Sequence, residues 1–392
     1  MSTHVEEHIR PIVSPDDQKV TFVELFFDLV FVFCVTQVVT LLHDHLDLHA
    51  AASALLVFWL VWWAWTQFTW ALNAANTDHP RVQIVTLLAT AVAFFMGVGI
   101  PRALEGGAVW FAVPYVVVRV VGLLLYYWVA WGDPLQRRAV HTFSSLSIAG
   151  LIAVLIGAIL GGSAPYLWWA LAIALDLVAA GIGGQLEGWN LHPEHFVERH
   201  GLIVIITLGE ALIVAAAGLA GATRMPTVIG TAVLAVAVTC GLWWSYFRNA
   251  RPMFEHALAE RTGRARSCMA RDMFSVIHFP MLCGVIAMAA VTEQALAHPD
   301  EPLALTARLA LGGGAVLFVC GTAGALWRAT GTATSSRWVL APVAAFTVVV
   351  FGVLPWVAML IVLAMLVAVG VVEHRTARLA PLHPGQRITW TA

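Results

Sequence analysis

The sequence has few charged residues for its length. Charged side chains make up 11% of its 392 residues and hydrophobic side chains 60%, whereas an ordinary soluble domain has about 25% charged residues. Apolar runs long enough to cross a bilayer repeat from residue 20 to residue 373. This composition excludes an ordinary soluble globular protein and predicts an all-α polytopic membrane protein.

Several functional motifs are also absent. The five cysteines form no C-x-x-C pair, so neither a disulfide framework nor a cysteine metal site is indicated. The chain has no glycine-rich phosphate loop, no dinucleotide-binding pattern and no serine-protease-like triad motif. The first twenty residues lack the short apolar core of a secretory signal, so we expect the first helix to be retained. We expect no cofactor and no metal, and we favour a non-enzymatic role while leaving an enzyme open.

Twelve membrane spans are predicted, because a bilayer core of about 30 Å needs roughly 20 apolar residues per helix. The last apolar run is divided between Gly352 and Pro355, since proline cannot continue a helical hydrogen-bond ladder. The predicted spans are 21–42, 51–73, 83–100, 108–131, 142–160, 164–184, 200–220, 226–247, 272–296, 303–327, 337–353 and 355–373.

The basic residues outside these spans are segregated. If the N-terminus is inside, the outer loops carry only Arg102 and Arg224, and the other basic loop residues lie on the inner side. Lysine and arginine collect in cytoplasmic loops. We therefore expect the segment 1–20 and the tail 374–392 to be cytoplasmic.

Weak internal sequence similarity divides the spans into two halves, 21–190 and 191–373. Phe22-Val-Glu24 resembles Phe196-Val-Glu198, and a tryptophan-rich stretch of the second span resembles one of the eighth. Six is an even number of helices, so the sequence predicts two six-helix repeats of parallel topology, like the paired halves of some transporters.

Glu24 and Asp28 are the most unusual residues of the first span. Ionised side chains at this depth are costly and need partners, and a spacing of four residues places these two on one helix face. Arg119 lies near the middle of its span and is the expected counter-charge for one or more of the buried carboxylates, with Asp176 at a comparable depth. Gln37 faces away from Asp28. An ion pair that only orients helices is the alternative.

A second polar string leads into the seventh span. His195, Glu198, Arg199 and His200 are expected at its cytoplasmic mouth, as polar contacts at a helix start. Thr207 and Glu210, three residues apart, share a face deeper in the span, and Glu210 is the best single candidate for a titrating group. His278 is either a core histidine with its hydrogen bonds satisfied or part of the same polar path.

Two loops invite binding hypotheses. His43, His45 and His49 with neighbouring aspartates match no zinc-protease motif and are expected to be solvated. The stretch from Arg248 to Arg271 contains six arginines. Attraction to anionic lipid headgroups, with an interfacial helix, explains it without nucleic acid.

The two polar strings are similar to a known family. FVELFFDLVFVFCVTQ and HFVERHGLIVIITLGE resemble sequences of bacterial low temperature requirement A (LtrA) proteins, and HFPMLCG fits the same pattern. The resemblance covers about residues 18–370 and implies a multi-pass protein of the bacterial inner membrane, without implying a reaction. The matching motif positions are Glu24, Asp28, Gln37, His195, Glu198, Arg199, Gly201, Gly209 and Glu210.

From these residues we expect a proton- or cation-coupled transporter of an unknown solute. Asp28 and Glu210 would exchange the coupling ion, Arg119 would set their charge state or bind an anionic solute, and Gln37 and Thr207 would supply polar contacts. Three alternatives remain. They are a membrane-embedded enzyme acting on a lipid or isoprenoid near His195, a non-catalytic lipid-sensing protein, and a cation channel. The last follows a looser likeness of Phe26-Phe27-Asp28 to the Phe-Ser-Asp triplet of two-halved potassium channels.

Overall fold

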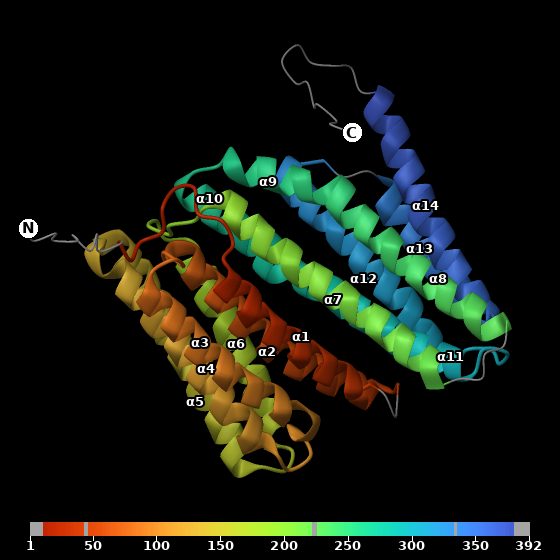
Figure 1. Ribbon diagram of the computed structural model, residues 1–392, viewed down its shortest axis with the longest axis horizontal. Helices are drawn as coiled ribbons and strands as arrows, with labels where there is room; N and C mark the ends of the chain where they lie inside the picture. The colour runs from red at the N-terminus through yellow and green to blue at the C-terminus, as the bar shows by residue number, and fades with distance from the viewer. Residues whose placement is uncertain (1–10, 43–45, 222–225, 333–334, 380–392) are drawn as a thin grey trace, which may run out of the picture.

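The computed structural model describes residues 11–42, 46–221, 226–332 and 335–379, and most of them are helical (Figure 1). The first six helices are α1 (Phe22–Thr40), α2 (Leu48–Ala74), α3 (Pro80–Gly99), α4 (Ala108–Val129), α5 (Pro134–Leu160) and α6 (Ala164–Gly183). They are followed by α7 (Pro193–Gly221), α8 (Pro226–Trp243), α9 (Arg251–Ala259), α10 (Gly263–Ala270), α11 (His278–Ala297), α12 (Leu305–Thr330), α13 (Ser335–Phe351) and α14 (Pro355–Leu379).

Proline marks many of the helix starts. It is the first residue of α3, α5, α7, α8 and α14, where its missing N–H would have had no helical partner. α1 begins with a capping box instead. The backbone N–H and the hydroxyl of Thr21 donate to Glu24 Oε2 at 2.9 and 3.0 Å, so Glu24 stabilises the first turn of the helix that carries it.

The all-α polytopic fold is confirmed. Among the described residues, eleven helices are long and apolar enough to cross a membrane, and the shorter α13 is also apolar. The last apolar run is divided where the sequence predicted. Gly352 adopts a φ of +56°, which glycine tolerates at no steric cost, and Pro355 begins α14.

The helices form two groups (Figure 1). In the first, α1 packs on α3, α3 on α4, α4 on α5 and α5 on α6; in the second, α7 packs on α11, α11 on α12, α12 on α13 and α13 on α14. The groups meet where α1 and α2 contact α7 and α11. Buried aromatic rings fill this junction, including Trp62, Trp65, Phe196, Phe274 and His278.

The stretch 248–271, expected to be a loop with an interfacial helix, is mostly helical and continues the helices on either side of it. The chain continues from α8 through a π-helical segment, η3 (Trp244–Ala250), into α9. After a short turn, α10 leads through a second π-helical segment, η4 (Arg271–Ile277), into α11. These continuous helices run over Pro226–Ala259 and Gly263–Ala297. At 1.5 Å per residue each is about 50 Å long, so both extend beyond a bilayer core.

Some sequence predictions fall outside the described residues. They concern residues 1–10 of the N-terminal segment, His43 and His45 of the first histidine cluster, Arg224, and the tail from 380 onward. His49 is exposed, and its Nε2 lies 3.0 Å from the Tyr166 hydroxyl. The described part of the N-terminal segment packs on the end of α2, where Ser14 N–H donates to the Ala74 carbonyl at 3.0 Å.

Candidate functional site at the junction of the two helix groups

Two carboxylates lie buried on one face of α1. Glu24 and Asp28 are 0% and 1% exposed, and their spacing separates them by about 40° around the helix axis. An ionised carboxylate in an apolar interior is costly unless it is paired and hydrogen-bonded. The partners come from α7 and α2, which border α1 at the junction.

α7 supplies the counter-charges. His195 Nε2 lies 3.0 Å from Glu24 Oε1. Arg199 Nη2 donates to Asp28 Oδ1 at 2.8 Å, and its Nη1 lies 3.5 Å from Glu24 Oε1. Both contacts join residues 171 positions apart. An equal separation at successive turns means that α1 and α7 run side by side in the same direction.

α2 completes the arrangement. Trp65 Nε1 donates to Asp28 Oδ1 at 2.8 Å, and the Arg199 guanidinium lies 5.7 Å from the centre of the Trp65 ring, within cation–π distance. Asn73 Nδ2 donates to His195 Nδ1 at 2.9 Å. His195 therefore carries its proton on Nε2, facing Glu24. We call this set the α1–α7 cluster: Glu24, Asp28, Trp65, Asn73, His195 and Arg199.

The hydrogen bonding of the α1–α7 cluster is incomplete. Within the described part of the chain, four atoms of the cluster are buried without a hydrogen-bond partner: Glu24 Oε1, Asp28 Oδ2, and Nε and Nη1 of Arg199. Glu24 Oε1 still lies within ion-pair distance of His195 and Arg199. Buried polar atoms in native proteins are nearly always hydrogen-bonded, and each exception asks for an explanation. Asp28 Oδ2 is thus a carboxylate oxygen open to a proton or a water molecule.

A line of hydrogen bonds connects the cluster with the end of the bundle. Asn73 Oδ1 accepts from the His192 N–H at 2.8 Å, and Asn73 Nδ2 also donates to the His192 carbonyl at 3.1 Å. His192 Nε2 lies 2.6 Å from Ser14 Oγ. His192 precedes α7 and is partly exposed; burial, and then the charge of His195, lowers its pKa. Polar contacts therefore run from a partly exposed histidine to buried Asp28.

Arg119 belongs to a different set of contacts. Its Nη1 and Nη2 donate to the two carboxylate oxygens of Asp176 at 2.9 and 2.8 Å. Nη1 also donates to the Tyr115 hydroxyl at 2.6 Å, Nε donates to Gln67 Oε1, and Ser147 Oγ donates to Asp176 Oδ1 at 3.1 Å. We call this the Arg119–Asp176 cluster: Gln67, Tyr115, Arg119, Ser147 and Asp176.

Arg119 was expected to pair with one or more of the buried carboxylates, and it pairs with Asp176 but not with Glu24 or Asp28. A two-pronged bond to Asp176 occupies both terminal nitrogens of Arg119, and Arg199 takes the position facing α1. One guanidinium does approach both α1 carboxylates, as the helical spacing allows, but it comes from α7. Asp28, Arg119, Asp176 and Glu210 therefore do not share one cluster.

Glu210 lies farther along the same helix pair. Thr36 Oγ1 of α1 donates to Glu210 Oε2 at 2.6 Å, and Glu210 is buried. Thr207 is also buried, and its hydroxyl donates to the Ile203 carbonyl of its own helix at 2.9 Å. Gln37 is half-buried, and none of the side-chain hydrogen bonds of the described residues involves its amide.

The predicted mouth of the seventh span is mostly buried. His195, Arg199 and His200 have at most 1% exposure, whereas Glu198 is half-buried and outside the α1–α7 cluster. His200 packs against the Trp65 and Phe274 rings. The seventh helix begins earlier than the predicted span 200–220, because α7 starts at Pro193 and already includes Arg199.

His278 is a core histidine with both ring nitrogens bonded. Its Nδ1 donates to the Met273 carbonyl at 2.7 Å, and its Nε2 lies 2.8 Å from the Tyr246 hydroxyl. No group of three or more potential metal ligands occurs among the described residues. Of the candidate site residues predicted from the sequence, four lie in the α1–α7 cluster and two in the Arg119–Asp176 cluster.

Sequence reasoning missed the uncharged members of both clusters. Trp65, Asn73, Gln67, Tyr115 and Ser147 are ordinary residues of apolar spans, and nothing local marks them. Arg199 carried a usable signal. It follows Phe196-Val-Glu198, which is similar to Phe22-Val-Glu24. Alignment of these two stretches would have indicated that α7 corresponds to α1.

A comparison with known proteins agrees with the resemblance seen in the sequence motifs. The sequence pattern of the family described as Bacterial low temperature requirement A protein (LtrA) matches residues 19–372. The chain belongs to the LtrA family. A relative of this LtrA chain in Rhizobium meliloti (strain 1021), described as an uncharacterized protein, is 28% identical over 319 residues, which cover 78% of this chain and 77% of the relative. No solved structure matches the chain.

Proposed function

We propose that this LtrA chain is a proton-coupled membrane transporter whose α1–α7 cluster binds the proton. The observation that carries the proposal is the unpaired Oδ2 of buried Asp28, facing a helix junction that Arg199 holds together. Ionisable residues inside membrane spans are costly and commonly mark ion paths. A proton fits better than a metal cation, because the positive Arg199 already lies against both carboxylates.

The proposed coupling step is a change of charge at Asp28. When Oδ2 takes a proton, the carboxylate becomes neutral and its charge-assisted bond from Arg199 weakens, since such bonds are about twice as strong as neutral ones. α1 and α7 belong to different helix groups. Loss of this bond would loosen the contact between the two helix groups. The groups could then rock against each other, as alternating access requires.

Glu210 offers a second proton position on the same helix pair. It contacts Thr36, twelve residues beyond Glu24 on α1, or about 18 Å along the helix. The proposed path thus runs from His192 past Glu24 and Asp28 to Glu210, along one face of α1. In this proposal Arg199, and not Arg119, sets the charge state of Asp28. Gln37 and Thr207 are not part of the proposed proton path.

We also propose that the two helix groups, 21–190 and 191–373, are parallel repeats. If α8–α9 and α10–α11 are each counted as one span, each group has six spans. In both groups the first span packs on the third, the third on the fourth, the fourth on the fifth and the fifth on the sixth. The Glu24–His195 and Asp28–Arg199 pairs span 171 positions, and Thr36–Glu210 spans 174. Duplicated first helices that meet at an axis between the halves would produce such a register.

Orientation and lipid contacts are proposals of the same kind. The exposed Arg261 and Arg264 lie at the connection between α9 and α10, at one end of the bundle (Figure 1), where they would meet anionic headgroups of the cytoplasmic leaflet. The enzyme alternative placed a polar site at His195 and His200. Their burial against α1 and α2 favours a site inside the bundle, as in a transporter.

A proteoliposome experiment tests the proposal. Purified protein is reconstituted with a pH-sensitive dye inside, a pH gradient is imposed, and a panel of amino acids, sugars, organic acids and inorganic ions is added in turn. We expect one solute class to change the internal pH. Asp28→Asn should abolish that change, whereas Glu198→Gln, a neutral substitution of a carboxylate outside the cluster, should preserve it. If no solute in the panel moves a proton while a known transporter in parallel liposomes does, the proposal fails.

A further inference from the structure

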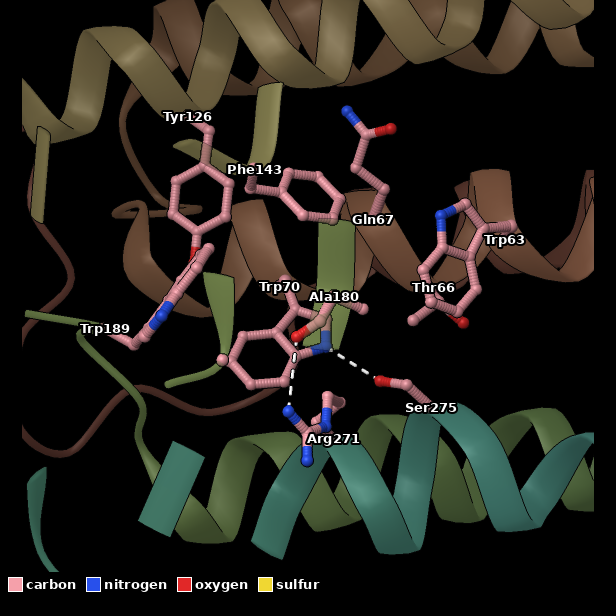
Figure 2. A pocket seen from close by; sticks show the side chains of 11 residues that line it. Trp63, Thr66, Gln67, Trp70, Tyr126, Phe143, Ala180, Trp189, Arg271 and Ser275 are labelled. Atoms are coloured by element: carbon pink, nitrogen blue, oxygen red, sulfur yellow. Dashed lines mark hydrogen bonds between the residues drawn. The ribbon is translucent and has the colours of Figure 1, made fainter. Parts of the chain in front are cut away.

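A small cavity lies on the other side of α2 from the α1–α7 cluster. Residues of α2, α4, α5 and α6 form most of its wall, and η4 of the second helix group closes it (Figure 2). Its volume is about 50 Å³, several times the minimum that one water molecule needs. The cavity therefore has room for several waters or for part of a small molecule.

Aromatic rings dominate the wall of the cavity. Trp189, from the segment between α6 and α7, packs edge-on against Trp70 at 5.5 Å and against Tyr126 at 5.4 Å between ring centres. Phe143 and Trp63 also face the space (Figure 2). Such walls favour flat ring compounds, which stack on aromatic side chains or meet them edge to face.

Three polar atoms of the wall have no hydrogen-bond partner in the described part of the chain. They are Trp63 Nε1, Thr66 Oγ1 and the Tyr126 hydroxyl, and each residue is at most 3% exposed. Polar groups this deeply buried are satisfied by a protein group, an ordered water or a ligand. The indole N–H of Trp63 can only donate, so its partner must be an acceptor.

The cavity provides no unmatched charge. Arg271 is its one charged lining residue, and the guanidinium donates to Asp272 Oδ1 at 2.8 Å and 2.5 Å and to the Ala180 and Gly181 carbonyls at 3.3 Å. Trp70 Nε1 likewise donates to Ser275 Oγ at 3.0 Å (Figure 2). The lining therefore suits a neutral ligand.

η4 adds an independent indication. Arg271 and Ser275 both belong to this π-helical segment, and π-helical turns inside α-helices occur frequently at functional sites. Here the segment brings the second helix group against the first at the cavity. An occupant would contact both groups at once.

We propose that this cavity binds the head group of a neutral, membrane-soluble ring compound that carries carbonyl acceptors, the chemistry of a quinone. The ring lies among the aromatic side chains, and its carbonyl oxygens accept from Trp63 Nε1–H and from the Tyr126 or Thr66 hydroxyl. Binding requires no proton transport, so this inference and the proposed function stand or fall separately.

Binding of menadione to the purified full-length protein in detergent, measured by titration calorimetry, tests the inference. Thr66→Val and Tyr126→Phe each remove one polar atom and keep the side-chain shape, whereas Trp63→Phe removes the indole N–H together with part of the ring. We expect Tyr126→Phe to weaken binding about three- to tenfold, the usual effect of one hydrogen bond, and Trp63→Phe to weaken it at least as much. The hydrocarbon 2-methylnaphthalene, which lacks both carbonyls, should bind at least about tenfold more weakly than menadione.

Trp59→Phe is the matched control. Trp59 Nε1 also lacks a partner, but Trp59 does not line the cavity, so this variant should bind menadione like the wild type. Thermal unfolding without ligand gives a second measurement. In Thr66→Val and Tyr126→Phe, which keep the side-chain shape, removing an unpaired buried polar atom should leave the unfolding temperature unchanged or raise it.

Three results would overturn the inference. The first is no binding of menadione by the wild type, which would leave the cavity to water alone. The second is equal affinity of the wild type and the three cavity variants. The third is a marked fall of unfolding temperature in Thr66→Val or Tyr126→Phe, which would show that these polar atoms already have partners in the protein.

Discussion

The chain buries two ion-pair clusters that differ in how completely their atoms are paired. In the Arg119–Asp176 cluster every nitrogen of the guanidinium donates, and both carboxylate oxygens accept, within one helix group. In the α1–α7 cluster, Asp28 Oδ2 and two nitrogens of Arg199 lack hydrogen-bond partners, and the contacts cross between groups. A fully satisfied network makes one arrangement rigid. The α1–α7 cluster is incompletely paired and lies between the two groups, and for this reason we propose it as the part of the molecule that changes.

The two clusters should differ most in the stability that is lost when the carboxylate charge of each ion pair is removed. Asp176→Asn leaves the buried Arg119 without its counter-charge, and breaking a buried pair in this way costs about 3–5 kcal/mol. Asp28→Asn should cost less, about 1–2 kcal/mol, because Arg199 keeps Glu24 nearby. Unfolding in detergent measures both. Equal losses of stability would remove the distinction between the clusters.

Replacing the whole Arg119–Asp176 pair should restore much of the lost stability. A double variant, Arg119→Met with Asp176→Leu, leaves no uncompensated charge, and apolar replacements of buried pairs are often neutral or stabilising. We expect its unfolding free energy to exceed that of Asp176→Asn by about 2 kcal/mol or more. A double variant as unstable as the single one would indicate that the pair does more than orient helices.

Trp65→Phe separates the hydrogen bond from the ring. The substitution removes the N–H that donates to Asp28 and keeps an aromatic face beneath Arg199. A hydrogen bond to a charged group contributes about 1.5–3 kcal/mol, and we expect a loss near the lower value together with reduced solute-driven proton uptake in liposomes. Normal uptake would exclude Trp65 from the proton site.

Ser147→Ala is the corresponding small change in the other cluster. It removes one donor from Asp176 Oδ1, which still accepts from Arg119. Hydrogen bonds between membrane helices contribute about 0.6 kcal/mol on average. Stability in detergent should fall by about that amount, and proton uptake in liposomes should remain at the wild-type level.

The smallest effect concerns His192. Its pKa is lowered in the folded protein, so the unfolded chain binds a proton there more readily, and folding stability is lost as the pH falls below the ordinary histidine value of about 6.5. His192→Gln should flatten this dependence between about pH 7 and 5. An unchanged pH profile of the unfolding temperature would contradict the assignment.

The sequence predicts the helices well and the pairings poorly. Apolar runs, the proline helix starts and the Gly352–Pro355 break are local signals, because each acts on its own segment of chain. Which helix faces which is set by packing over distant parts of the chain. Depth alone could not choose between Arg119 and Arg199 as the partner of Asp28, and the rule for positive loops placed Arg199 outside the membrane. The uncharged donors Trp65 and Gln67 carry no sequence signal of their own.

Infrared difference spectroscopy between neutral and acidic pH tests the central claim most directly, because it detects a buried carboxyl group when it takes up a proton. We predict that the wild type gains carbonyl bands of protonated carboxyl groups and that Asp28→Asn lacks one of these bands, which Asp176→Asn retains. If Asp28→Asn keeps every band of the wild type, or if the band assigned to Asp28 disappears in Asp176→Asn, proton binding at the α1–α7 cluster is contradicted.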